Sequence, residues 1–312
     1  MNEPSLASLF FRHGRSGAWA GAIAPLFFLL ILLMRSAALA AVCDASQICA
    51  PDEDPCVIDT TYEIEEDCVL DFGSRTLTLT GAGSLKFEGV SLSILAGELV
   101  LESGGVLDGD GKGDGGSVFI TLIDGLESSG KIDVSSDVTV GTNEVWAGGN
   151  VVLDGNTWYA NNENADTSDG TIHLVSSAGA ISIGTVLDAS GGSAAAGGDI
   201  ELEAEGRIDI QSKLDVGGGE FDGGSISVES SNDIVLGAVS LIANGGGSGG
   251  YGGNVTINAG ADLSSEATIK ANGSSTGGDW SGDGAYIDLT AAGTLFLIDG
   301  DIKAKVSIHR GN

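Results

Sequence analysis

A four-residue pattern of hydrophobic and small residues recurs along most of this chain. An aliphatic or aromatic residue is followed by a variable residue, a small residue, and usually Gly, Asn or Ser. These phrases begin 25 to 29 residues apart, at Leu107, Ile132, Trp158, Leu187, Leu214, Leu241 and Ile269. A fixed period of this length indicates a stacked repeat architecture, in which each repeat packs against its neighbours.

A second pattern, Gly-x-aliphatic-x-aliphatic, follows a Gly-rich stretch in five of the repeats. It begins at Gly116, Gly149, Gly198, Gly224 and Gly253. In the repeat that starts at Gly198, residues 200–204, 208–210 and 213–216 each alternate between apolar and polar positions. Alternation with period two is typical of β-strands that bury one face. Each repeat therefore contains three short strands.

We predict an all-β fold, a right-handed parallel β-helix with three short strands per coil of about 27 residues. The residues predicted to point inward are Ile200, Leu202, Ile208, Ile210 and Leu214, stacked on Ile226, Val228, Ile234, Leu236 and Leu241 of the next coil. An antiparallel β-sandwich also has short strands, but it does not require one residue class to return to the same position in every repeat. Low-complexity disorder, the other alternative for a chain with 51 Gly, is disfavoured because the hydrophobic residues, 42% of the total, alternate regularly.

The Gly-rich loops after every third strand should stack along one edge of the β-helix. Four aromatic residues lie in or near these loops and are the candidate ligand-binding residues: Trp146, Phe221, Tyr251 and Trp280. Aromatic rings on an exposed edge can stack on sugar rings, so we expect glycans as partners. The alternative is that each ring covers its own loop. A binding edge requires at least three of the four rings to be exposed on the same side.

The N-terminus has the pattern of a secretory signal peptide over residues 1–41. Arg12 and Arg15 precede an apolar run over residues 18–34, and small residues with Ala38 and Ala40 follow. The alternative is an uncleaved membrane anchor, since the apolar run approaches spanning length. We expect cleavage, a mature chain without a membrane span, and a secreted or cell-surface location.

The four cysteines cluster in residues 42–70, which we predict to be an N-terminal cap preceding a β-helix domain at 71–312. They are Cys43, Cys49, Cys56 and Cys68. An even number of clustered cysteines in an exported protein favours two disulfides, with three possible connectivities. A four-cysteine zinc site is the alternative, but it usually has tight Cys-x-x-Cys pairs. A cap would cover the exposed apolar end of the first coil.

The chain is strongly acidic, with a net charge of −31. Such a surface argues against nucleic acid and anionic lipid as partners, and it can attract divalent cations. The candidate calcium ligands are Asp108, Asp110 and Asp114, in a run of alternating Asp and Gly that resembles the start of a calcium loop. Lys112 stands where a third ligand is expected. The alternative is a solvated acidic face that prevents self-association of the strands.

The sequence offers little support for catalysis. No nucleophile elbow, metalloprotease helix or phosphate-binding loop is present. His173 falls on the outward side of a predicted strand, where we expect a solvated residue. Arg207 beside Asp209 is the nearest approach to a base and an acid on one face, and such neighbours are usually a local charge pair.

The repeats at Leu187 to Gly192 and Gly197 to Ile210 resemble those of large bacterial surface proteins, the filamentous-haemagglutinin-like adhesins and autotransporter passengers. The resemblance covers about residues 70 to 312. It implies a bacterial outer-surface location and a generic fibre-like fold. A two-partner-secretion start motif and a C-terminal barrel are not recognisable, so we expect either a short secreted relative or a truncated reading frame.

Two functions follow from these observations. The first is a non-enzymatic secreted or cell-surface β-solenoid with a structural or adhesin-like role. The second is a carbohydrate-active β-helix enzyme similar to pectate lyases, with the pectin lyase-like fold. Three or more acids with a base on one face would favour the enzyme. Columns of like residues stacked between coils, either aliphatic or Ser, Thr and Asp, would favour the structural role, which we prefer.

Overall fold

The computed structural model describes residues 43–162, 170–247, 249–274 and 285–304. The chain divides into residues 1–40 and residues 41–312, and the described residues all belong to the second unit. The predicted signal peptide and Trp280 lie outside the described residues. Within them, the structure contains β-strands and one short 3₁₀ turn, η1 (Ala45–Gln47), and no helix long and apolar enough to cross a membrane.

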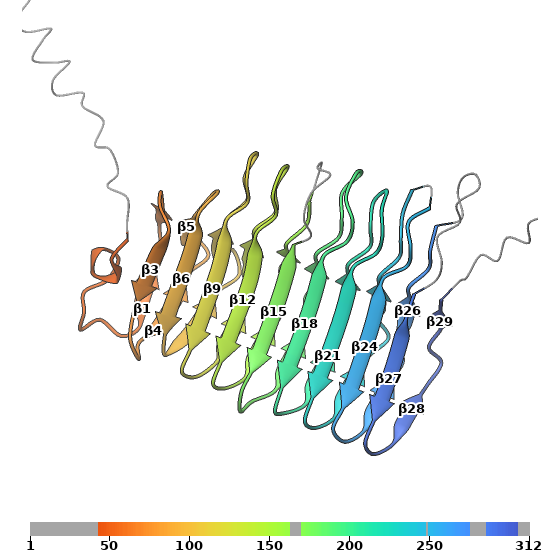
Figure 1. The fold of residues 1–312 in the computed structure, drawn as a ribbon. Helices are drawn as coiled ribbons and strands as arrows, with labels where there is room; N and C mark the ends of the chain where they lie inside the picture. Colours follow the sequence, from red (N-terminus) through yellow and green to blue (C-terminus); the bar gives the residue numbers. More distant parts are fainter. Residues whose placement is uncertain (1–42, 163–169, 248, 275–284, 305–312) are drawn as a thin grey trace, which may run out of the picture. The chain divides into compact units, whose positions relative to one another are not determined.

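The described strands form three parallel sheets of ten, ten and nine strands, to which successive coils contribute in turn. Figure 1 shows the third sheet, from β3 to β27, in front. The first sheet contains β1 (Cys56–Ile58), β4 (Thr76–Leu79), β7 (Glu98–Leu101), β10 (Leu126–Ser128), β13 (Val151–Leu153), β16 (Ile181–Ile183), β19 (Ile208–Ile210), β22 (Ile234–Leu236), β25 (Leu263–Ser265) and β28 (Leu295–Leu297). The second contains β2 (Thr61–Glu63), β5 (Ser84–Lys86), β8 (Val106–Asp108), β11 (Lys131–Asp133), β14 (Trp158–Tyr159), β17 (Leu187–Asp188), β20 (Leu214–Asp215), β23 (Ser240–Ile242), β26 (Thr268–Lys270) and β29 (Ile302–Lys303). The third contains β3 (Cys68–Asp71), β6 (Ser91–Ala96), β9 (Ser117–Leu122), β12 (Thr142–Ala147), β15 (Thr171–Ser176), β18 (Asp199–Ala204), β21 (Ser225–Ser230), β24 (Asn254–Ala259) and β27 (Ile287–Ala291).

This topology confirms the predicted right-handed parallel β-solenoid with about 27 residues per coil. The described strands pair in parallel, each with the equivalent strand of the next coil, which excludes an antiparallel sandwich.

Inward residues of successive coils stack in register and form one aliphatic core. Ile208 pairs with Ile181 on one side and Ile234 on the other, and all three side chains are fully buried. The ten residues predicted to point inward are all buried, so that prediction is confirmed. Burial of a large aliphatic side chain contributes about 1.5–3 kcal/mol, and each coil buries several.

One of the five Gly-x-aliphatic assignments was wrong. The run after Gly149 forms β13 of the first sheet, whereas the other four runs form strands of the third sheet. The equivalent glycine is Gly141, where an added Cβ would lie 1.7 Å from the Gly116 carbonyl oxygen. Gly224 has the same environment, with a Cβ position 1.8 Å from the Gly198 oxygen. The backbones of successive coils touch here, so only glycine fits.

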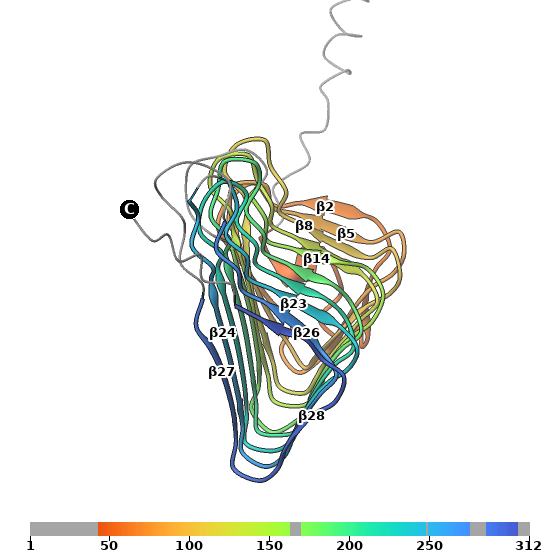
Figure 2. The same cartoon turned by 90° about the vertical axis from the view of Figure 1, so that its right-hand side faces the viewer.

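Differences in coil length arise mainly in the loop between the second and third sheets. This loop has four residues after β2 and β5, eight after β8 and β11, and nine to sixteen in the later coils. The loops hydrogen-bond to one another, as from Gly191 N to Gly217 O (2.8 Å) and from Gly218 N to Asn244 O (2.8 Å). They gather at one corner of the coil (Figure 2), which confirms that the Gly-rich loops stack along one edge.

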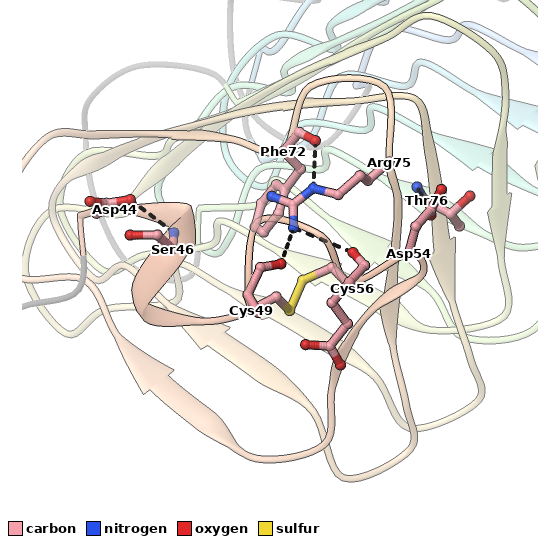
Figure 3. Close-up of a disulfide and its surroundings, with 10 residues drawn as sticks. Asp44, Ser46, Cys49, Asp54, Cys56, Phe72, Arg75 and Thr76 are labelled. Atoms are coloured by element: carbon pink, nitrogen blue, oxygen red, sulfur yellow. Dashed lines mark hydrogen bonds between the residues drawn. A yellow bond between two sulfur atoms is a disulfide. The ribbon is translucent and has the colours of Figure 1, made fainter.

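The N-terminal end of the solenoid is closed by residues 43–55 and two disulfides, Cys43–Cys68 and Cys49–Cys56. The rest of the segment predicted as a cap, up to residue 70, forms β1, β2 and most of β3, which pair with strands of the next coil. All four cysteines are paired, as predicted. Arg75 fixes this segment to the next coil: its Nε donates to the Phe72 carbonyl (2.9 Å) and its Nη1 to the Ala50 carbonyl (2.8 Å) (Figure 3). The first coil is therefore covered on the side where no coil precedes it.

Candidate functional site

Five side chains gather on the outward face of the third sheet, where β12, β15 and β18 lie side by side. We call them the histidine patch: Glu144, Trp146, His173, Glu201 and Glu203. The strands have six residues each, and alternation turns their third and fifth residues outward. Register pairing places Glu144, His173 and Glu201 in one outward column, while Trp146 and Glu203 belong to the adjacent column.

Trp146 and Glu144 hold one side of the patch. The indole Nε1 of Trp146 donates a hydrogen bond to the Glu144 carboxylate. The Trp146 and His173 rings form a T-shaped pair, with centroids 5.4 Å apart and planes at 79°. This contact covers much of the imidazole, whose side chain is only 17% exposed. His173 is therefore not the solvated strand residue that the sequence suggested.

The other side of His173 faces two carboxylates. His173 Nε2 lies 4.0 Å from Glu201 Oε2, and this nitrogen is buried without a hydrogen-bond partner among the described residues. One ligand atom from each of His173, Glu201 and Glu203 lies within 4.8 Å of the other two. An imidazole nitrogen and two carboxylates can hold a divalent metal ion, or act as a base beside two acids.

A polar groove of about 270 Å³ adjoins the patch and shares Glu203 with it. The groove is lined by Val175, Ser176, Ser177, Glu203, Ala204, Glu205, Glu229 and Ser231. Its three carboxylates give it a negative potential, which favours a cation or a neutral hydroxylated ligand over an anion.

The structure does not bring the three predicted calcium ligands to one point. Asp108 forms an ion pair with Lys86 across two strands (3.7 Å), and Asp114 bridges to the backbone of Thr139 in the next coil. Asp110 lines a separate depression with Glu88, Gly111, Lys112 and Asp137. Among the described residues these aspartates do not form a group of metal-ligating atoms. Calcium binding there stays a prediction.

Two of the four candidate aromatic residues lie together on the loop edge. Phe221 and Tyr251, each about half exposed, line a groove of about 430 Å³ with the acidic residues Glu220 and Asp222. Trp146 lies instead on the outward face of the third sheet, and Trp280 is outside the described residues. The described residues therefore place two of the four rings on the loop edge, fewer than the three that we required for a binding edge. Trp158, a fifth aromatic residue of the repeats, is fully buried in the core.

Arg207, just before β19, forms a local ion pair with Asp209 of that strand (2.8 Å) at the solvent-accessible surface. Asp209 also accepts a hydrogen bond from the Gln211 side chain. These contacts are those of an ordinary charge pair within one strand.

The histidine patch is not apparent from the sequence because its members come from three coils. The Gly-x-aliphatic pattern at Gly149 is not equivalent to the other four. Aligning it with them conceals that Glu144 and His173 occupy equivalent positions. Gly141, Gly170 and Gly198 each precede an outward residue by three positions, and these residues are Glu144, His173 and Glu201. Counting from those glycines would have found the column.

No family model matches this chain, and no curated protein or solved structure matches it either.

Proposed function

We propose that this chain is an exported, non-enzymatic β-solenoid that acts as a structural or adhesin-like element at a bacterial surface. The observation that carries the proposal is the stack of three parallel ladders closed at its N-terminal end by two disulfides. Disulfides persist in oxidising compartments outside the cytoplasm. The signal-like pattern of residues 1–41 supports the same location.

The adhesive part of the proposal concerns the groove between Phe221 and Tyr251. Two half-exposed rings from successive coils stand beside the carboxylates of Glu220 and Asp222. Rings of this kind stack on the apolar faces of sugars, and carboxylates accept hydrogen bonds from hydroxyl groups. We therefore propose a neutral glycan as the partner of this groove.

Export is tested by expressing the full chain with a C-terminal epitope tag in a Gram-negative host. Cell fractionation should recover a processed protein outside the cytoplasm, and thiol alkylation should find all four cysteines blocked until reduction. Unprocessed protein in the cytoplasm with free thiols would contradict the proposal.

Adhesion is tested on a glycan array with the Phe221→Ala/Tyr251→Ala double variant. Phe296→Ala is the matched control, because Phe296 is also half exposed but lies in β28 of the first sheet. Binding of the wild type and the control, lost in the double variant, would support the groove. Equal binding by all three proteins would remove it as the adhesive site.

A second candidate function, a carbohydrate-active enzyme, is favoured by one specific observation. His173 lies beside Glu201 and Glu203, and Glu144 is its register neighbour in the preceding strand, so one face carries a base and three acids. Incubation with neutral and acidic polysaccharides, followed by detection of new reducing ends or unsaturated products, tests this function. Turnover lost in His173→Ala would support the enzyme, and no turnover on any substrate would favour the scaffold.

A further inference from the structure

We propose that His173, Glu201 and Glu203 bind one divalent cation of the zinc type on the outer face of the third sheet. The site joins β15 to β18, so the ion would link two successive coils. This inference does not depend on the adhesive or the enzymatic role.

The backbone already holds the three ligands in place. β15 and β18 pair over six residues, with His173 opposite Glu201 and Val175 opposite Glu203. Adjacent parallel strands lie about 4.8 Å apart, so ligands from paired positions can reach one ion with small rotations of the two carboxylates. Two ligands that each lie about 2.0–2.2 Å from one tetrahedral zinc ion are about 3.4 Å apart. The ligand atoms here lie within 4.8 Å of one another, so the carboxylates would have to turn inward to bind the ion.

His173 Nε2 gives an independent reason to expect an ion. This atom is shielded from solvent and has no hydrogen-bond partner among the described residues. Buried polar atoms are nearly always satisfied, and an orphaned one calls for an explanation such as a bound ion. Trp146 packs against the imidazole ring and limits its movement, so the nitrogen is held toward Glu201 rather than toward bulk water.

The charges around the site point the same way. Glu203 lies directly opposite Glu229 in the register of β18 and β21. Like charges at paired positions of adjacent strands destabilise a sheet. A divalent cation at Glu201 and Glu203 would offset this repulsion.

The donor set decides which cation fits. Calcium and magnesium prefer a complete shell of oxygen ligands, whereas an imidazole with two carboxylates suits zinc. Three protein ligands leave a fourth position for water or for a ligand from the adjoining groove. Glu144 is already bonded to the Trp146 indole, so we do not include it among the ligands.

The test is isothermal titration of the full chain, prepared without a histidine tag, with Zn²⁺ alone at pH 7, and with Ca²⁺ in a parallel titration. The variants are His173→Gln and Glu203→Gln. Glu127→Gln is the matched control, because it removes the same charge from an exposed strand position of the first sheet. Circular dichroism checks that each variant is folded.

We expect the wild type to bind one equivalent of Zn²⁺ and to show a higher melting temperature in its presence, because a ligand of the native state stabilises it. Each ligand variant should lose at least about tenfold in Zn²⁺ affinity, and Glu127→Gln should lose none. Three results would each overturn the proposal: no saturable binding up to about 1 mM Zn²⁺, wild-type affinity in folded His173→Gln, or an equal loss in Glu127→Gln. Tighter binding of Ca²⁺ than of Zn²⁺ would also contradict it, since the imidazole would then have no role.

Discussion

The first and the last coil of the solenoid contain equivalent hydrophobic positions, yet their side chains have very different exposure. In the first coil, Cys56, Ile58 and Leu70 are at most 1% exposed. In the last coil, Leu295 is 43% exposed and Ile302 is 47% exposed, although they pair in register with the buried residues Leu263 and Ile269. The same repeat position is therefore buried in one coil and exposed in another.

This comparison shows that burial in a solenoid is supplied by neighbours and not by the coil itself. An interior coil is covered on both sides, and the first coil is covered by residues 43–55, held by their disulfides. Terminal repeats require such covers because a single coil cannot bury its own apolar face. The unfolding free energy lost when a core residue is replaced should therefore depend on whether its coil is interior or terminal.

The largest expected effect comes from placing a charge at equivalent sites in the middle and at the end. Ile208→Asp puts a carboxylate into the dry core and should cost at least about 4 kcal/mol of unfolding free energy, enough to disrupt the surrounding coils. Leu295→Asp, at the equivalent position of the last strand, which is 43% exposed, should cost less than about 1 kcal/mol. Urea denaturation followed by circular dichroism measures both. Equal losses would contradict the comparison, as would an Ile208→Asp variant as stable as the wild type.

The disulfides should stabilise the first coils selectively. Replacing Cys43 and Cys68 by Ser removes a link that spans 25 residues, whereas the Cys49–Cys56 link spans 7. From loop-closure entropy we expect losses of about 3.5 and about 2.5 kcal/mol, respectively. Hydrogen exchange should become faster in β1 and β4 and remain unchanged in β22 and β25. A uniform increase in exchange rate in all coils would contradict the expectation that the disulfides stabilise only the first coils.

Two ion pairs of similar geometry provide a finer test. Lys131 Nζ lies 2.8 Å from Asp133 in an interior coil, and Lys303 Nζ lies 2.8 Å from Asp301 in the last coil. Asp133 is buried and also accepts a hydrogen bond from Ser135 N, while Asp301 is exposed. Lys131→Met leaves the buried Asp133 carboxylate without its ion-pair partner and should cost about 1–2 kcal/mol of unfolding free energy. Lys303→Met should have no measurable effect. Adding Asp133→Asn to Lys131→Met should recover most of the loss. No recovery would mean that the loss does not come from the unpaired carboxylate.

The smallest expected effect is a dependence of the Lys131 contribution on pH. Partial burial lowers the pKa of Lys131, but the hydrogen bond and charge of Asp133, with Asp108 and Asp110 beyond, outweigh it and raise the pKa above its usual value. A raised lysine pKa stabilises the fold below the unfolded-state pKa of about 10.4, and the effect disappears as pH rises through the folded-state pKa. The stability difference between wild type and Lys131→Met should therefore be constant from pH 7 to about pH 9 and shrink as pH rises above the unfolded-state pKa of about 10.4. A difference that grows with alkaline pH would contradict this sign.

The sequence predicted the coil because the same residue class returns to the same position, and register then fixes the core. It was less informative where the pattern is interrupted. Asn143 occupies a buried core position in β12, where its Nδ2 donates to the Tyr159 carbonyl. A polar residue in an aliphatic column conceals the repeat, and the Gly-x-aliphatic pattern matches the run after Gly149 instead.

The repeat pattern is not recognisable in the coils before Leu107 for a different reason. Their loops between the second and third sheets have only four residues, so the Gly-rich stretch that marks later coils is missing. The histidine patch could not be predicted from local spacing. His173 and Glu201 are paired across two coils, and their pairing depends on the exact number of residues between the two strands. Periodicity thus predicts the core, while contacts between outward residues require the exact register.

The core and the histidine patch both depend on that register, and engineered cysteines test it directly. Ser227 and Thr256 are paired outward positions on β21 and β24, about 4.8 Å apart if the sheet is in register, which a disulfide can span. Asn258 lies two residues farther along β24, beyond the roughly 7 Å limit for a disulfide. Under mild oxidation, Ser227→Cys/Thr256→Cys should crosslink rapidly in the folded protein, while Ser227→Cys/Asn258→Cys should remain reduced. Equal crosslinking of the two pairs, or a preference for the second, would contradict the stacked register on which the core and the histidine patch depend.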